Sequence, residues 1–135
     1  MRRFISYSLA VISISLLASC ASMQDSKNVY FVAPADGATV TSPFMVKFGV
    51  TGMDLKPAGD ATPNSGHHHL LINLASMPEG QSIPFNATHM HFGKAQSEAE
   101  IKLPPGKYTL TMQFGNKDHL SYGAPMSKSI TVTVK

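Results

Sequence analysis

Apolar and polar residues alternate with a period of two along much of the chain. The alternation is clearest at residues 44–51, 98–103, 108–114 and 130–135, and shorter apolar runs lie at 29–32 and 70–74. A period of two places successive side chains on opposite faces of an extended strand. Clusters of proline, glycine and aspartate, which favour turns, separate these segments. The pattern therefore predicts seven or eight short antiparallel strands.

No segment of the sequence shows a sustained helical period, which favours an all-β fold. Short strands with one apolar face each are typical of an immunoglobulin-like β-sandwich, and a small barrel is the competing β fold. The cysteine–tryptophan–cysteine core of antibody domains is absent, because the chain has one cysteine and no tryptophan. The expected likeness is therefore one of architecture.

The N-terminal segment has a different pattern from the rest of the chain. Arg2 and Arg3 precede an apolar run at residues 4–17, which is shorter than the roughly 20 residues of a membrane span. The run ends in Leu17-Ala18-Ser19-Cys20, which resembles the lipobox of a bacterial lipoprotein signal. The resemblance implies cleavage before Cys20, lipidation of that cysteine and attachment to a membrane. An ordinary signal peptide or membrane anchor with a chance cysteine is the alternative.

These features divide the chain into three parts. We predict a lipoprotein signal peptide at residues 1–19, a lipidated cysteine and tether at 20–27, and a single β-sandwich domain at 28–135. Ala21, after the cysteine, resembles an outer-membrane sorting signal. The expected location is the bacterial cell envelope, on the outer membrane facing the periplasm.

Charge and cysteine content narrow the functions open to the domain. Both arginines lie in the predicted signal peptide, so nine lysines face eight acidic residues from Cys20 onward. This near-neutral balance, without a basic stripe, excludes nucleic acid as an expected partner. With Cys20 lipidated, the domain has no thiol for disulfides, nucleophilic catalysis or zinc–thiolate sites.

Five of the six histidines fall in two short segments, at residues 67–69 and at 89 and 91. If both segments are strands, His67 and His69 share one face, and His89 and His91 share one face of the second strand. The opposite faces are apolar and are expected to point inward, with Leu70, Ile72, Leu74, Met90 and Phe92 in the core.

An antiparallel pairing with His67 opposite His91 and His69 opposite His89 places facing Cβ atoms about 4.5–5.5 Å apart. Imidazoles at this spacing can share one ion with metal–nitrogen bonds of about 2.0–2.1 Å. We therefore predict a site for a divalent metal, copper or zinc, formed by His67, His69, His89 and His91. Candidate additional residues are His68 and His119 as ligands and Asp118 as an acceptor that orients a ligand ring.

Other interpretations of the histidines stay open at this point. The connection between the two segments contains prolines and a glycine and can hide another short strand, which would separate them. Adjacent histidines can also simply cap a strand, or form a metal-free surface that recognises an envelope protein or a glycan. A metal-dependent hydrolase or oxidase is less favoured, because no general base, nucleophile elbow or phosphate loop is evident, and no catalytic residue is predicted.

Several longer motifs resemble an uncharacterised bacterial family, the domain of unknown function 4399. They are Pro34-Ala35-Asp36-Gly37, the run from Gly66 to Ile72, His91-Phe92-Gly93-Lys94 and Leu103-Pro104-Pro105-Gly106-Lys107. The resemblance spans roughly residues 28–134. It implies a small exported β domain with the histidine motif as a hallmark, and it implies no activity. Residues 116–119 depart from the family's more histidine-rich pattern.

Overall fold

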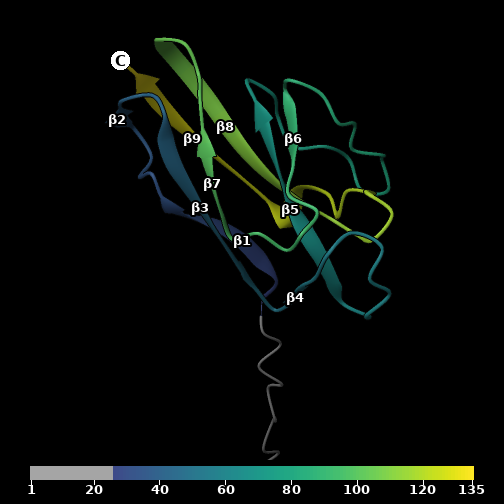
Figure 1. Cartoon of the computed structure of the whole chain (residues 1–135). Coiled ribbons are helices and arrows are strands. Elements are labelled where there is room, and N and C mark those ends of the chain that lie inside the picture. Colours follow the sequence, from purple (N-terminus) through teal and green to yellow (C-terminus); the bar gives the residue numbers. More distant parts are fainter. Residues whose placement is uncertain (1–25) are drawn as a thin grey trace, which may run out of the picture.

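The computed structural model describes residues 26–135, which form two packed β-sheets (Figure 1). The predicted all-β sandwich is confirmed. Among residues 26–135 there is no α-helix, and no helix in that range is long and apolar enough to cross a membrane. The predicted signal peptide and Cys20 lie outside the described residues. The elements are β1 (Asn28–Ala33), β2 (Ala38–Val40), β3 (Phe44–Thr51), β4 (Asp54–Leu55), β5 (Ser65–Ile72), β6 (His89–His91), β7 (Glu98–Ile101), β8 (Gly106–Gly115), the 3-10 turn η1 (Ala124–Met126) and β9 (Ser127–Val134).

The two sheets differ in size and in strand direction. One has three strands in the antiparallel order β1-β3-β7, and the other has the order β2-β9-β8-β5-β4, with β6 also paired to β5. The pairs β2–β9 and β4–β5 are parallel, so the prediction of purely antiparallel strands is wrong at these two short pairs. The turn at residues 34–37 carries the chain from one sheet to the edge of the other, where β2 runs alongside β9. The immunoglobulin-like connectivity stays a prediction.

The main core lies between the sheets and follows the alternation in the sequence. On β3, Phe44, Val46 and Phe48 are buried, while the residues between them are exposed. The inward side chains of β8 meet them from the other sheet, and each fully buried apolar side chain contributes about 1.5–3 kcal/mol. The core residues of β8 and β9 are Leu110, Met112, Phe114, Ile130, Val132 and Val134.

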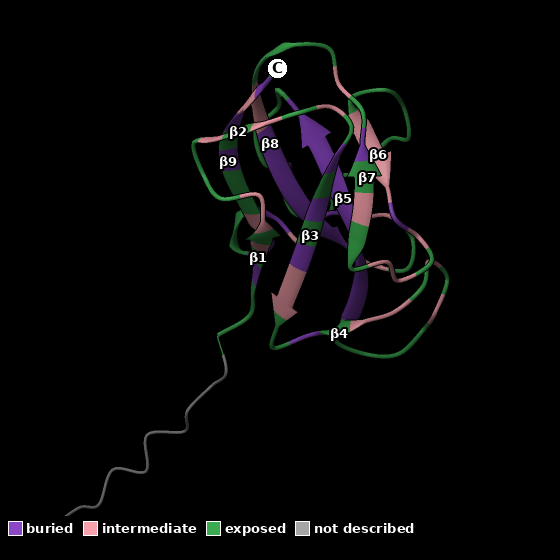
Figure 2. Cartoon of the chain, turned by 60° about the vertical axis from the view of Figure 1, so that its left-hand side comes forward, coloured by how far each residue is buried: buried purple, intermediate pink, exposed green. Residues whose placement is uncertain are grey.

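Strand β5 is buried at all eight positions, on both of its faces (Figure 2). Its inward side chains join the main core, as the alternation predicts. Its outward side chain Leu71 packs in a second, smaller core with Met77 and Ile83 from the following connection. Leu74, predicted to point inward, lies beyond the end of the strand and is 37% exposed. The strand ends because Asn73 takes a left-handed backbone with a φ of 57°.

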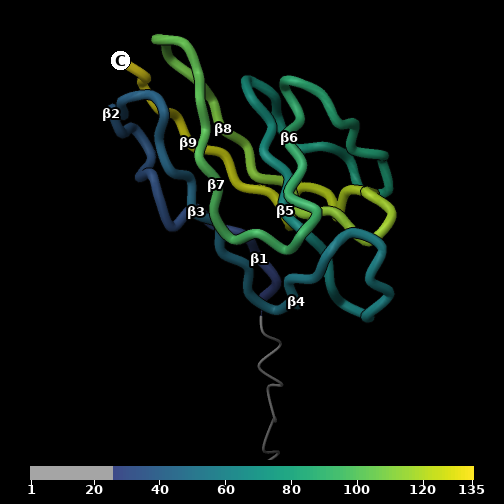
Figure 3. The backbone as a smooth tube through the Cα atoms, viewed as in Figure 1, coloured from purple at the N-terminus to yellow at the C-terminus, as the bar shows by residue number. Residues whose placement is uncertain are grey.

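Two connections cover the outer face of β5, at residues 73–88 and 116–126 (Figure 3). They are bonded to each other: the backbone N–H of Ile83 donates to the carbonyl of His119 at 2.8 Å, and that of Ser121 donates to Gln81 at 2.9 Å. The first connection thus contains an isolated β-bridge, between Ser82 and Leu120, in place of a further strand. The two connections therefore shield the outer face of β5 from solvent.

Both connections are also fixed to the sheet by one buried amide. The side chain of Gln113, on the outer face of β8, accepts a hydrogen bond from the backbone N–H of Met77 at 2.9 Å. Its amide nitrogen donates to the carbonyls of Gly123 at 3.0 Å and Met126 at 3.3 Å. This fully buried glutamine satisfies three backbone groups and so holds the two connections, which we call the cover, in one position. Loss of these hydrogen bonds would leave buried polar groups without partners and away from water.

Candidate metal centre

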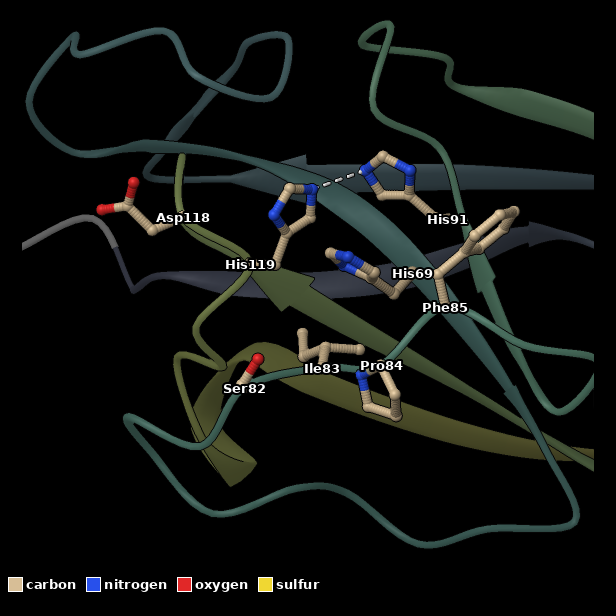
Figure 4. Close-up of a pocket in the computed structure, with 8 residues that line it drawn as sticks. All are labelled: His69, Ser82, Ile83, Pro84, Phe85, His91, Asp118 and His119. Carbon is tan, nitrogen blue, oxygen red and sulfur yellow. Dashed lines mark hydrogen bonds between the residues drawn. The ribbon is translucent and has the colours of Figure 1, made fainter.

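Four imidazoles meet beneath this cover. They belong to His67 and His69 of β5, His91 of β6 and His119 of the second connection, and one ring nitrogen from each lies within 4.8 Å of the other three. Three of them, His69, His91 and His119, are drawn in Figure 4 with their rings toward one another. The rings of His67 and His69 are 0% and 1% exposed, while His91 and His119 are half-buried. The four ligand candidates thus come from three separate segments of the chain.

Strand pairing explains how three of the rings come together. His67 and His69 are two residues apart on β5 and so share its outer face. The partner of His69 on β6 is His91, and the partner of His67 on β8 is Gly115, which has no side chain to compete for the space. The strands thus bring three imidazoles to one point on the sheet.

A tight turn supplies the fourth ring. The side-chain oxygen of Asn116 accepts hydrogen bonds from the backbone N–H groups of Asp118 at 2.9 Å and Leu120 at 3.0 Å. Within this turn His119 has a φ of 62°, in the left-handed region that residues with a Cβ rarely adopt. Such strain is a frequent feature of functional sites, where the surrounding structure holds a residue in an unfavourable conformation.

The spacing of the ring nitrogens matches a metal shell. The Nε2 atom of His91 lies 3.2 Å from Nε2 of His67 and 3.0 Å from Nε2 of His119. In a tetrahedral shell with metal–nitrogen bonds of about 2.0–2.1 Å, neighbouring nitrogens lie about 3.3 Å apart. At these two separations the Nε2 atoms can share protons, or their lone pairs can converge on one cation.

Two of the cluster rings carry buried nitrogens without a hydrogen-bond partner among the described residues. These atoms are Nδ1 of His67 and both ring nitrogens of His69. Buried polar atoms are satisfied in the great majority of protein interiors, so each exception calls for an explanation. A cation bound by the cluster would satisfy one of the unpaired nitrogens of His69, while Nδ1 of His67 lies on the other side of its ring from the Nε2 atom that faces the cluster.

Two glycines make room for the rings. A methyl group added at Gly93 would overlap the His91 ring, and one added at Gly115 would come within 2.8 Å of Cε1 of His69. Because a β-carbon at either position would displace a ligand candidate, the His-Phe-Gly and Phe-Gly sequences are part of the site. The sequence pattern did not reveal a role for these glycines, because a glycine beside an aromatic residue produces no periodic signal.

Burial keeps three rings of the cluster in the neutral form that a metal needs. Burial, and then the neighbouring imidazoles of His91 and His119, lower the pKa of His67 to about 4 from its ordinary value of 6.5. Burial, with the other cluster rings, lowers the pKa of His69 to about 3. The pKa of His91 is also lowered, by burial first and then by His119. At neutral pH the lone pairs of these three rings are therefore free to bind a cation.

The structure does not bring His89 to the cluster. Its Nδ1 lies 3.0 Å from Oδ1 of Asn86 and 3.1 Å from Oγ1 of Thr88. The predicted register is wrong by two residues, since His69 pairs with His91 and Leu71 with His89. The observed register sets Met90 opposite Leu70, so two apolar side chains pack together at the core instead of Met90 facing His68.

The other candidate residues lie apart from the ring nitrogens. His68 points inward between the rings of Phe48 and Phe114, with ring centroids 5.1 and 5.0 Å away. The carboxylate of Asp118 is exposed and pairs with the ammonium group of Lys117 at 2.8 Å. His119, expected as an additional ligand, is a full member of the cluster.

The fold and the site together define a β-sandwich with four histidines gathered under the connections on one outer face. Residues 46–135 match the family described as Domain of unknown function (DUF4399), and the chain belongs to this family. All four cluster histidines lie in the matched range. Comparison with the curated proteins and with the solved structures found no match.

Proposed function

We propose that this chain is a lipoprotein of the bacterial cell envelope whose domain holds a divalent metal, copper or zinc, for capture or delivery. The metal is bound by His67, His69, His91 and His119. The single observation that carries the proposal is the convergence of four ring nitrogens from three segments, all within 4.8 Å. Its anchoring part rests on the N-terminal sequence, where the lipobox pattern ends at Cys20.

The donor set favours these two metals. All four donors are imidazole nitrogens, which suit zinc, copper, iron and nickel, and copper forms the most stable complexes of the divalent series. The cluster contains no carboxylate, which calcium and magnesium require. Because burial lowers the pKa values of His67, His69 and His91, and one nitrogen of each of the four rings is already close to the others, binding a cation needs little rearrangement.

The proposal is tested by titrating the full chain, purified in detergent, with Cu(II) and with Zn(II) by calorimetry. We expect one tightly bound ion per chain. His69→Ala with His91→Ala should weaken binding at least about 100-fold, because removing even an outer partner of a metal ligand costs 10–100-fold. His89→Ala is the matched control, since His89 lies on the same strand as His91 but outside the cluster, and it should leave the affinity unchanged.

Two results would contradict the metal assignment: no stoichiometric binding of either ion, or an equal loss of affinity in the single variants His89→Ala and His91→Ala.

The anchor is tested separately by mass spectrometry of the mature protein. We expect acyl groups on Cys20 and release of the protein into the soluble fraction after Cys20→Ser. An unmodified N-terminus that keeps residues 1–19 would refute the lipoprotein assignment while leaving the metal site untouched.

A further inference from the structure

A pocket opens directly onto the ring cluster. It has a volume of about 350 Å³, and three of the four cluster histidines, His69, His91 and His119, line it (Figure 4). The fourth, His67, is not among the lining residues and is fully buried. A cation held by the four rings therefore has one side toward the protein and one side toward an open space.

The wall of this pocket combines apolar and polar groups. Ile83 is 4% exposed and forms its apolar floor, and the ring of Phe85, 80% exposed, stands 6.0 Å from the His91 ring between centroids. Ser82, which is exposed, brings a hydroxyl group to the lining of the pocket. Apolar walls lower the local dielectric constant, which strengthens any interaction between a cation and a charged ligand inside.

Charge at the site is unbalanced when a cation is bound. Four neutral imidazoles leave the double positive charge of the ion uncompensated, and a partly buried charge without a counter-charge is costly. Among the described residues, Asp118 is the acidic residue that lines the pocket, and its carboxylate oxygens lie 2.8 and 3.0 Å from the ammonium group of Lys117, with which it forms an ion pair. Within residues 26–135, no unpaired acidic side chain lines the pocket, which leaves room for a negative charge supplied by a bound anion.

We propose that the pocket binds a small inorganic monoanion that coordinates the metal as an additional ligand. This inference rests on the metal site proposed above and specifies its occupant on the open side. Cu(II) favours the tetragonal geometry that accepts such a ligand beyond four nitrogens. The space beside His69, His91 and His119 holds an ion of two or three atoms next to the cation, with the Ser82 hydroxyl on the rim as a hydrogen-bond donor.

The test uses the full chain in detergent, loaded with one equivalent of Cu(II), and azide as the probe. Azide bound to Cu(II) adds a charge-transfer absorption, so its dissociation constant is read from a titration. Ser82→Glu places a carboxylate on the pocket rim, where it competes with the anion, and we expect azide affinity to fall at least tenfold. Ser76→Glu adds the same charge on the same connection but outside the pocket, and it should leave azide affinity within about twofold.

A second measurement needs no variant. At constant ionic strength, chloride should compete with azide in the wild-type protein, while the weakly coordinating perchlorate should not. A copper-loaded protein that shows no azide absorption, equal effects of chloride and perchlorate, or equal effects of the two glutamate variants would overturn the anion site alone. Failure to load either copper or zinc would overturn both proposals, whereas a protein that loads zinc but not copper would overturn the anion site alone. Because loading is measured first, the two failures are distinguishable.

Discussion

Replacing His68 with leucine tests the effect of the buried core histidine on stability independently of the metal cluster. Its side chain is 0% exposed, and neither ring nitrogen has a hydrogen-bond partner among the described residues. Leaving a buried polar group unpaired costs about 1–3 kcal/mol, and leucine has a similar volume without polar atoms. We therefore expect His68→Leu to raise the free energy of unfolding by about 1–3 kcal/mol at pH 7.5.

The same substitution should flatten the pH dependence of stability. Burial, and then the neighbouring His67, lower the pKa of His68 to about 4 from the 6.5 of an exposed histidine. Below pH 6.5 the unfolded chain takes up a proton on this ring, while the folded domain does not until about pH 4. The stability linked to the neutral ring is thus complete above pH 6.5 and is lost as the pH falls toward 4. One pKa unit corresponds to about 1.4 kcal/mol, so at pH 5 the loss from His68 is about 2 kcal/mol.

The assay is urea unfolding of the full chain in the presence of a chelator at pH 7.5 and at pH 5.0. The advantage of His68→Leu over the wild type should grow by about 2 kcal/mol between the two conditions. In a separate titration without chelator, the copper stoichiometry of the variant should stay at one. A further loss of stability at low pH comes from His67, His69 and His91, whose pKa values are also lowered and which the variant keeps. An advantage that is equal at both pH values would refute the buried, neutral state of His68, and a loss of copper binding would place it in the site.

Three further outcomes are expected. Gly93→Ala should weaken copper binding at least about tenfold, because the added methyl displaces the His91 ring. The control is Gly37→Ala, where the backbone is left-handed and the space is open; it should cost about 1 kcal/mol of stability and leave the copper affinity unchanged. Calorimetry that shows equal affinity losses in the two variants would contradict the steric argument. Gln113→Leu should destabilise the domain by about 2–4 kcal/mol and speed hydrogen exchange in the connection at 73–88, because the backbone N–H of Met77 and two carbonyls lose their partner; unchanged exchange there would show that other contacts hold the cover. Copper at 100 times its dissociation constant should stabilise the wild type by about 2.7 kcal/mol in a thermal unfolding scan, and no stabilisation would mean that the ion binds the unfolded chain equally well.

The faces of the strands could be predicted from the sequence, but their burial could not. Alternation assigned Leu110, Met112 and Phe114 to the inside and placed His67 and His69 together on the other face of their strand, as observed. It also implied that this other face meets solvent, since one apolar face per strand is the usual reading of such a pattern. In the structure the connections at 73–88 and 116–126 cover it, and irregular segments carry no period that reveals where they pack.

The register between the two histidine strands shows a limit of the same kind. Shifting a strand by one residue moves every side chain to the opposite face, but shifting it by two residues returns each to its own face. Alternation therefore cannot distinguish a pairing of His67 with His91 from the observed pairing of His69 with His91. Packing of Met90 against Leu70 makes that choice, and it removes His89 from the site. His119 was recognisable as a candidate, but only the turn capped by Asn116 places its ring.

Histidines on the two faces of β5 carry unpaired ring nitrogens, and we expect metal to affect the stability contributed by the two faces differently. On the outer face, the unpaired nitrogens of His69 lie in a cluster where a cation can bind one of them, together with Nε2 of His67. On the inner face, those of His68 lie between two phenylalanine rings, beyond the reach of the same ion. The cluster exists only when β5, β6 and the turn at 116–120 are packed together, so binding stabilises the folded domain alone. Metal should therefore offset the instability that the outer histidines cause at low pH, by opposing their protonation, while the part due to His68 persists in the loaded protein.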